Sequence, residues 1–271
     1  MKKRLTILSL VLLSASLSLT ACGLLQAPEE ASGPIEAIPL ATEEAGVATA
    51  EPQQVAPTAA PTEASIEAVE PAVAATAAPT EAPAEQPTVA PAVTQVYTLD
   101  QTASQVRFQL DEDLRGQRTT VVGTTDQVAG EIAVNLADLS QTQVGVIQIN
   151  ARTLLTDNNF RNRAIQNEIL DTGQYEFITF TPTGVMGLPA SAAVGDTVSF
   201  TINGDLTIRD VTLPASFAVE AMVVSETQIT GTATAVVNRA DYGLQIPSVP
   251  NVANVEEEVE LYIDFTANAS Q

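Results

Sequence analysis

Residues 198–208, VSFTINGDLTI, carry the clearest structural pattern in the chain. Apolar residues and Gly204 hold the even positions, and serine, threonine, asparagine and aspartate hold the odd ones. A period of two is typical of a β-strand with one dry face and one wet face. The pair Asn203-Gly204 normally signals a hairpin turn, but the apolar parity continues through it. We therefore predict one long strand bent at Gly204, with the turn at residues 209–212, RDVT.

The same alternation recurs on both sides of this strand. The connections between the alternating stretches are short, which is typical of antiparallel pairing. Many long antiparallel strands indicate a closed barrel or a sandwich, so the predicted fold class is all-β. The other alternating stretches cover residues 104–110, 127–134, 217–223, 229–237 and 259–265.

One segment, DNNFRNRAIQNEIL at residues 157–170, breaks the alternation. Its apolar residues recur at helical spacing, in a face that begins at Phe160 and ends at Ile169. Asp157 or Asn158 is available as the N-cap. We predict one short amphipathic helix between the strands.

The start of the chain has the layout of a signal peptide, with a basic cluster at residues 2–4 and an apolar run over residues 5–19. This run is too short to span a bilayer comfortably. The sequence LTAC at residues 19–22 ends it, and Cys22 is the only cysteine in the chain. This tetrapeptide resembles the lipobox of bacterial lipoproteins, in which the signal is cut before a cysteine that carries a diacylglycerol. We expect residues 1–21 to be removed and Cys22 to be lipidated, with an ordinary secretory signal as the alternative.

Residues 22–95 have the composition of a linker. The stretch is dominated by alanine, proline, glutamate, threonine and valine, and contains neither lysine, arginine nor an aromatic residue. Such a segment cannot bury enough apolar surface to offset the entropy of ordering, so we predict a disordered, self-repelling tether. Its roughly seventy residues would span about 50 Å as a flexible coil. Residues 96–271 are enough for a single domain with a substantial core.

Composition excludes several classes of function. The formal net charge is -22, which argues against nucleic acid and against electrostatic docking on anionic lipid. The chain has no histidine, so it lacks the commonest general base and the commonest zinc ligand. We therefore expect no cofactor, no metal site and no enzymatic activity.

The dry strand faces have two interpretations. In a sandwich or a packed barrel they would form a filled core, which the pattern alone favours. A barrel of about eight long strands, however, is just wide enough to hold a ligand when small side chains leave room. Ala221, Gly231, Ala233 and Ala235 share the inward parity and are small enough to leave such room.

Four stretches of the domain together resemble one known family. They cover nearly all of residues 96–268 and resemble the YceI-like family of polyisoprenoid-binding proteins. The resemblance implies a lipocalin-like antiparallel β-barrel, extracytoplasmic, with an apolar interior that holds an isoprenoid chain. Burial of such a chain stabilises the complex by roughly 0.8 kcal/mol per methylene-sized group and requires only an apolar lining. The stretches are VYTLDQTASQVRFQL (96–110), TDNNFRNRAIQNEILDTGQYEFITFTPT (156–183), GDLTIRDVTLPASFAVE (204–220) and VNRADYGLQIPSVPNVANVEEEVELYIDFTA (237–267).

The resemblance and the strand parity together give candidate ligand-binding residues. Arg161 and Arg163 on the predicted helix are candidates for contact with a polar head group, and a solvated helix face is the alternative. The family often has tryptophan at the position of Tyr97 and histidine at the positions of Ala103 and Ala164. The candidate lining of the apolar cavity is Phe108, Ile132, Phe180, Phe200, Ile202, Leu206, Ile208, Phe217, Val219, Ile229, Ala233, Leu261, Ile263 and Phe265.

The expected function follows from these features. We expect a binding protein of the bacterial cell envelope, held on the extracytoplasmic side of a membrane by its lipid anchor. Its partner would be a polyisoprenoid or another lipophilic small molecule. The alternative is a non-catalytic surface interaction module with a packed core. Pairing of two barrels as a homodimer is compatible with the sequence.

Overall fold

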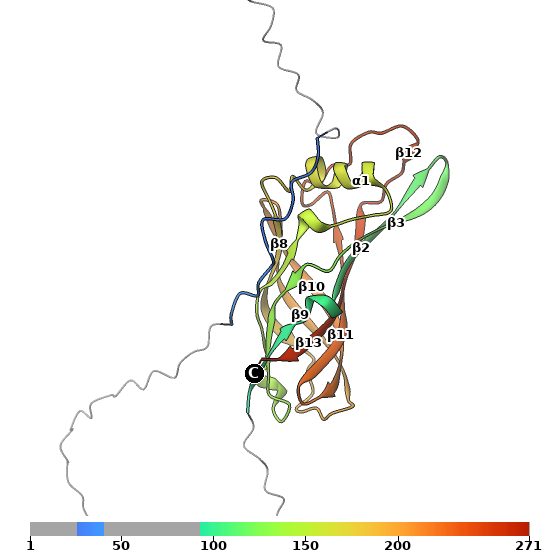
Figure 1. The fold of residues 1–271 in the computed structure, drawn as a ribbon. Coiled ribbons are helices and arrows are strands. Elements are labelled where there is room, and N and C mark those ends of the chain that lie inside the picture. Colours follow the sequence, from blue (N-terminus) through green and yellow to red (C-terminus); the bar gives the residue numbers. More distant parts are fainter. Residues whose placement is uncertain (1–25, 41–92, 271) are drawn as a thin grey trace, which may run out of the picture. The chain divides into compact units, whose positions relative to one another are not determined.

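The computed structural model describes residues 26–40 and 93–270, which belong to one compact unit of the chain. Residues 93–270 form a strongly curled antiparallel sheet, drawn out into a half-barrel, with one short helix at one end (Figure 1). The predicted all-β fold with a single short helix is confirmed. The predicted signal peptide, Cys22 and residues 41–92 of the predicted linker lie outside the described residues.

The central hairpin joins β9 (Thr197–Ile208) to β10 (Val211–Ser225), and it confirms the predicted long strand. The turn is shorter than predicted, because Val211 pairs with Ile208 and leaves only Arg209 and Asp210 in the loop. Arg209 has a φ of 58°, the left-handed conformation found in two-residue hairpin loops. Gly204 stays within the ladder opposite Ala215.

The sheet runs in the order β4-β7-β8-β9-β10-β11-β13-β1-β5-β6, and β2 joins it beside β13. Strand β13 pairs with β11 along its whole length on one side. On its other side it pairs first with β2 and then with β1. The remaining strands are β1 (Gln95–Leu99), β2 (Gln105–Leu114), β3 (Gln117–Thr125), β4 (Val128–Ala129), β5 (Glu131–Val134), β6 (Gln143–Val144), β7 (Ile147–Asn150), β8 (Phe177–Met186), β11 (Gln228–Asn238), β12 (Val252–Ala253) and β13 (Glu258–Ala269).

Short pairings join the two edges of the curled sheet. Strand β4 pairs with β7, and an isolated bridge links Thr124 at the end of β3 to Leu155. Three short 3-10 turns lie in the connections: η2 (Gln101–Ala103), η3 (Leu139–Gln141) and η4 (Ala151–Thr153). These pairings and turns leave the long strands free to curve around a common interior.

The helix α1 (Asn159–Ala164) continues into a π-helical turn, η5 (Ile165–Ile169). Asn158 caps it, because its side-chain oxygen accepts hydrogen bonds from the backbone N–H groups of Phe160 at 2.9 Å and Arg161 at 3.2 Å. The prediction that Phe160 belongs to the buried face is wrong, since this residue is 67% exposed. The buried apolar face begins one turn later, at Ala164, because the first turn projects at the rim of the barrel rather than over its interior.

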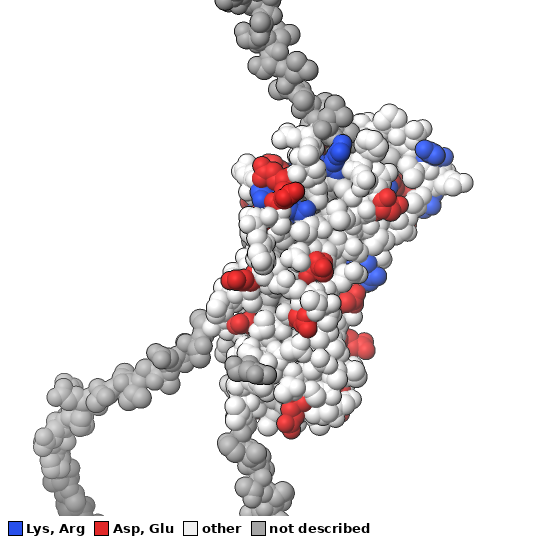
Figure 2. Space-filling view, in the orientation of Figure 1, with Lys and Arg blue, Asp and Glu red and all other residues white. Residues whose placement is uncertain are grey.

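Charge is distributed unevenly over the described part of the chain. Its arginines lie in β2, the β2–β3 hairpin, η4, α1, the β9–β10 turn and the residue after β11, which are at or near the helix-covered end. On the face drawn in Figure 2, the blue arginine atoms lie in the half nearer to α1, and red carboxylates occur at both ends.

Residues 26–40, hereafter the strap, lie against the barrel. We expected these residues to be part of the disordered linker, but the structure differs, because Ile35 is 4% exposed and several hydrogen bonds join the strap to the domain. The strap appears in blue in Figure 1, where it passes from the α1 end along the side of the sheet.

Candidate ligand cavity

The interior of the curled sheet is not filled by its own side chains. Alternation along the strands directs one face of each strand inward, and these inward faces enclose two adjoining cavities. The cavity nearer to the helix measures about 390 Å³, and the one farther from it about 100 Å³. The first value lies within the range of roughly 300–1,000 Å³ that is typical of small-molecule sites.

The smaller cavity is almost purely apolar. Its lining comes from the central strands, from η3 and from the loop between β8 and β9, and Thr142 is its only polar lining residue. Seven of the candidate residues line this cavity alone: Ile132, Phe200, Ile202, Val219, Ile229, Ala233 and Phe265.

The larger cavity lies between the strands, the helix and the loop over residues 244–255. Four candidate residues line this cavity alone: Phe108, Leu206, Ile208 and Leu261. The contribution of this loop was not predicted, because its apolar residues have no strand or helix period. The one available signal was the cluster of prolines and branched apolar residues in QIPSVPNV, at residues 245–252.

Two phenylalanines separate the cavities. Phe180 on β8 and Phe217 on β10 line both, and their ring centroids lie 4.8 Å apart at an interplanar angle of 65°. Such an edge-to-face contact is a favourable arrangement of aromatic rings. Ile263 on β13 also lines both cavities. All fourteen candidate residues thus lie on one cavity or the other, and their role in ligand binding stays a prediction.

Glycine positions in the sheet give space to aromatic rings. A Cβ atom on Gly204 would lie 2.6 Å from the Phe180 ring, and one on Gly231 would lie 2.8 Å from the Phe265 ring. We expected Gly231 to leave room for a ligand, but the space beside it is occupied by the Phe265 ring. The missing side chain of this glycine makes room for that ring.

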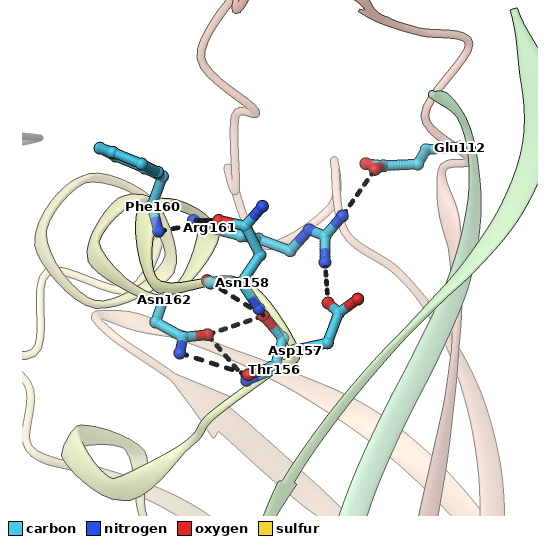
Figure 3. Close-up of polar contacts among 7 residues, drawn as sticks. All are labelled: Glu112, Thr156, Asp157, Asn158, Phe160, Arg161 and Asn162. Carbon is cyan, nitrogen blue, oxygen red and sulfur yellow. Dashed lines mark hydrogen bonds and ion pairs between the residues drawn. The ribbon is translucent and has the colours of Figure 1, made fainter. Parts of the chain in front are cut away.

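The rim of the larger cavity carries a charged cluster, shown in Figure 3. Arg161 on α1 donates to Glu112 at 2.9 Å and to Asp157 at 2.5 Å. Glu112 is only 5% exposed, because its parity on β2 directs it to the interior. The two carboxylates outnumber the single guanidinium, so the cluster carries no excess of positive charge.

The two candidate head-group residues differ in position. Arg161 lines the larger cavity, whereas Arg163 is not among its lining residues. In Figure 3 the Arg161 side chain extends toward β2, and Phe160 points away from that contact. Of the positions where the sequence departs from the family, Tyr97 and Ala103 line neither cavity, and Ala164 lines the larger one.

Buried polar side chains fix the helix over the cavity. The Asn162 side-chain oxygen accepts hydrogen bonds from the backbone N–H and the hydroxyl of Thr156, both at 2.7 Å. Gln166 donates to the backbone carbonyls of Arg152 at 2.8 Å and Leu154 at 3.1 Å. Polar groups with satisfied hydrogen bonds can be buried at little cost, and they specify one position of the helix.

Arg239 holds the loop that forms the opposite side of the rim. Its guanidinium donates to the backbone carbonyls of Leu244 at 3.0 Å and Glu256 at 2.9 Å, and to the Glu257 carboxylate at 2.9 Å. Tyr242, within the same turn, is buried. The arginine and the tyrosine of this turn therefore have structural roles in shaping the rim.

Two other kinds of feature are absent from residues 26–40 and 93–270. In this part of the chain no group of three or more histidine, cysteine, aspartate or glutamate residues is arranged to hold a metal ion. Among the same residues, no helix has the length and apolar character needed to cross a membrane.

A curled antiparallel sheet around an apolar cavity, with a polar rim at one end, defines a class of barrel with an internal ligand-sized space. Within this class the match is specific, because the YceI-like domain profile covers residues 97–267. The chain belongs to the YceI-like family. The predicted family membership is confirmed.

Two solved structures have a similar fold. The first is a polyisoprenoid binding domain from Saccharophagus degradans implicated in plant cell wall breakdown, with a TM-score of 0.52 and 17% identity over 65% of this chain and 99% of that one. The second is BcnA from Burkholderia cenocepacia, with a TM-score of 0.50 and 16% identity over 63% of this chain and 99% of that one. No curated protein matches the chain. At these identities the likeness concerns the fold.

Proposed function

We propose that this protein is a membrane-tethered binding protein that holds a lipophilic ligand, of polyisoprenoid type, in its barrel interior. The apolar cavity of about 390 Å³, continued by one of about 100 Å³ behind Phe180 and Phe217, carries the proposal. An isoprenoid tail needs an elongated apolar space and no catalytic group.

The rim supports a particular orientation of the ligand. Its charged cluster, centred on Arg161, lies on the larger cavity together with Arg239, so the tail enters first and the head group remains at the rim. Because Glu112 and Asp157 together outnumber Arg161, this cluster offers no unpaired positive charge and favours a neutral polar head group over an anionic one.

The tether and the location rest on the sequence. The lipobox-like residues 19–22 support lipidation of Cys22 and placement on the extracytoplasmic side of a bacterial membrane. The alternative, an interaction module with a packed core, requires a filled interior, and the two cavities argue against that requirement.

Uptake of a fluorescent prenyl analogue by the full chain tests the proposal. Ala233→Phe places a ring in the smaller cavity and is expected to reduce uptake of long prenyl chains. Ala218→Phe, on the outward face of the neighbouring strand, is the matched control and should bind like the parent. A parent chain that takes up no prenyl analogue would contradict the proposal.

A further inference from the structure

The strap is held by specific contacts along its length. The Asn167 side chain on η5 donates to the backbone carbonyl of Gln26 at 2.9 Å. The Ser32 N–H donates to the Glu176 carboxylate at 2.8 Å, and the Gln101 side chain donates to the carbonyl of Ile35 at 2.7 Å. These contacts begin at the helix and follow the strap to the 3-10 turn after β1.

Arg152 is the main clamp on the strap. Its guanidinium donates to the Glu29 carboxylate at 2.8 Å and to the carbonyl of Glu30 at 3.0 Å. The same group holds the domain through the carbonyl of Thr172 at 2.8 Å and the Glu176 carboxylate at 3.2 Å. The Arg152 and Glu176 side chains are 11% and 12% exposed, so this pair is shielded from water, whereas the Glu29 side chain of the strap is 59% exposed.

The strap also has an apolar anchor. Ile35 is buried, whereas Ile38 three residues later is 44% exposed. At its far end, the Leu40 N–H donates to the Glu131 carboxylate at 3.0 Å, and the Leu40 side chain lies beside Gly145. The strap therefore passes from the helix-covered end toward the middle of the barrel.

The strap begins close to Cys22 in the sequence. Only four residue steps separate Cys22 from Gln26, and an extended chain covers at most about 14 Å in four steps. Gln26 is bonded to η5 at the helix-covered end. The stretch between a lipidated Cys22 and the strap is therefore short, and it does not include residues 41–92 of the spacer expected from the sequence.

The surface of the helix-covered end is suited to a bilayer. Phe160 is exposed at the rim of the larger cavity, and aromatic side chains are favoured at the membrane interface. The arginines of the described residues lie at or near this end, where several of them pair with its carboxylates. The opposite end, around Asp196 and Glu226, has carboxylates without arginine among the described residues.

We propose that the helix-covered end of the barrel docks on the bilayer that holds Cys22, with Phe160 at the membrane surface and the larger cavity opening toward the lipid. This inference rests on the lipid anchor of the proposed function. A ligand taken from that bilayer would then enter the cavity without crossing open water, which an apolar tail strongly disfavours.

Depth-dependent quenching tests this orientation. The lipidated full chain is placed on vesicles of phosphatidylethanolamine and phosphatidylglycerol that contain a spin-labelled lipid. Lipidation uses the single native cysteine, so Phe160→Cys or Glu226→Cys provides one free thiol for a bimane dye. We expect the dye at position 160 to lose most of its fluorescence and the dye at position 226 to keep it. Equal quenching at both positions overturns the docking proposal.

A variant that detaches the strap from the barrel provides a second test in the same quenching experiment. Ile35→Asp removes the buried apolar anchor and is expected to abolish quenching at position 160, while Ile38→Asp, at an exposed strap position, preserves it. Circular dichroism checks that the barrel stays folded. Persistent quenching with Ile35→Asp overturns the role of the strap.

Failure of the anchor itself is recognised separately. Mass measurement of Cys22 and co-sedimentation with the vesicles report lipidation directly. An unmodified chain that does not sediment overturns the anchor and the docking together. A lipidated chain that sediments with equal quenching at both ends overturns the docking alone.

Discussion

The Phe180 and Phe217 rings determine how far a ligand tail can enter. Both rings line both cavities and meet edge to face, so a chain that fills the larger cavity must pass them to reach the smaller one. The length of the tail that the protein accepts therefore depends on these two side chains.

Phe180→Leu is expected to join the two cavities and to shift preference toward longer prenyl chains. Competition among prenyl alcohols of increasing length measures this preference. Phe200→Leu, which changes the smaller cavity alone, serves as the control and should leave the preference for short chains in place. An unchanged order of preference in Phe180→Leu would show that the ring pair does not limit the tail.

Gly231 is required by close packing rather than by backbone conformation. A Cβ atom there would lie 2.5 Å from the Glu220 carbonyl oxygen and 2.8 Å from the Phe265 ring. Gly231→Ala is expected to lower the free energy of unfolding by about 1–3 kcal/mol, because backbone and ring must both move. Gly184→Ala, with nothing within 4 Å of the added atom, should change it little. Denaturant unfolding of both variants checks the prediction, and equal stability would contradict it.

At the scale of elements, strand parity and the N-cap signal predicted the framework well. Strand parity holds even for a charged residue of β2, because Glu112 has the inward parity and is buried. The strap could not be predicted, because a single buried residue, Ile35, decides its docking within a sequence of alanine, proline and glutamate. The exposure of Phe160 was also not predictable. The apolar helical spacing includes this residue, but the first turn of α1 extends beyond the barrel interior that the rest of the helix covers.

Docking of the strap is expected to depend on pH through Glu176. Burial, the largest single effect, raises the pKa of Glu176, but hydrogen bonds from Ser32 and Asn150 and the charge of Arg152 outweigh it and hold this pKa below its ordinary value of 4.5. A depressed pKa means that the carboxylate stabilises the docked strap fully above that ordinary value. This contribution is lost as the pH falls through the lowered pKa.

Hydrogen exchange of the strap amides measures this dependence. Protection of the Ser32 amide is expected to be constant from neutral pH down to about the ordinary carboxyl pKa and to fall below it. Glu176→Gln should weaken protection at neutral pH and remove most of the acid dependence. Protection that does not change with pH in the parent chain would contradict the role assigned to Glu176.

At the scale of the whole molecule, composition divided the chain into a leader, a linker and a barrel domain. The long alternating strands made a barrel or a sandwich predictable from parity, and the family resemblance favoured the barrel. The open interior was not, because the pattern favoured a filled core and cavity volume depends on how side chains from strands distant in sequence meet. The separation into two cavities depends on the contact between Phe180 and Phe217, which lie on different strands.

Removal of residues 45–88 tests whether the strap, and not the later spacer, sets the distance between the barrel and the bilayer. The strap precedes this segment, so the deletion is expected to leave the quenching of a dye at position 160 unchanged. If the spacer set the distance between the barrel and the bilayer, its shortening would instead bring further positions of the barrel, such as 226, closer to the bilayer. Quenching that rises at position 226 after the deletion would favour the tether over the strap.

The central claim is that the barrel interior is an apolar space for a hydrocarbon chain. A crystal structure of the protein prepared with a prenyl alcohol tests it most directly. We expect continuous ligand density in the larger cavity, with the hydroxyl at the rim near Arg161 and the tail directed toward Phe180. A cavity closed by its own side chains, with the prenyl alcohol bound elsewhere or not at all, would contradict it.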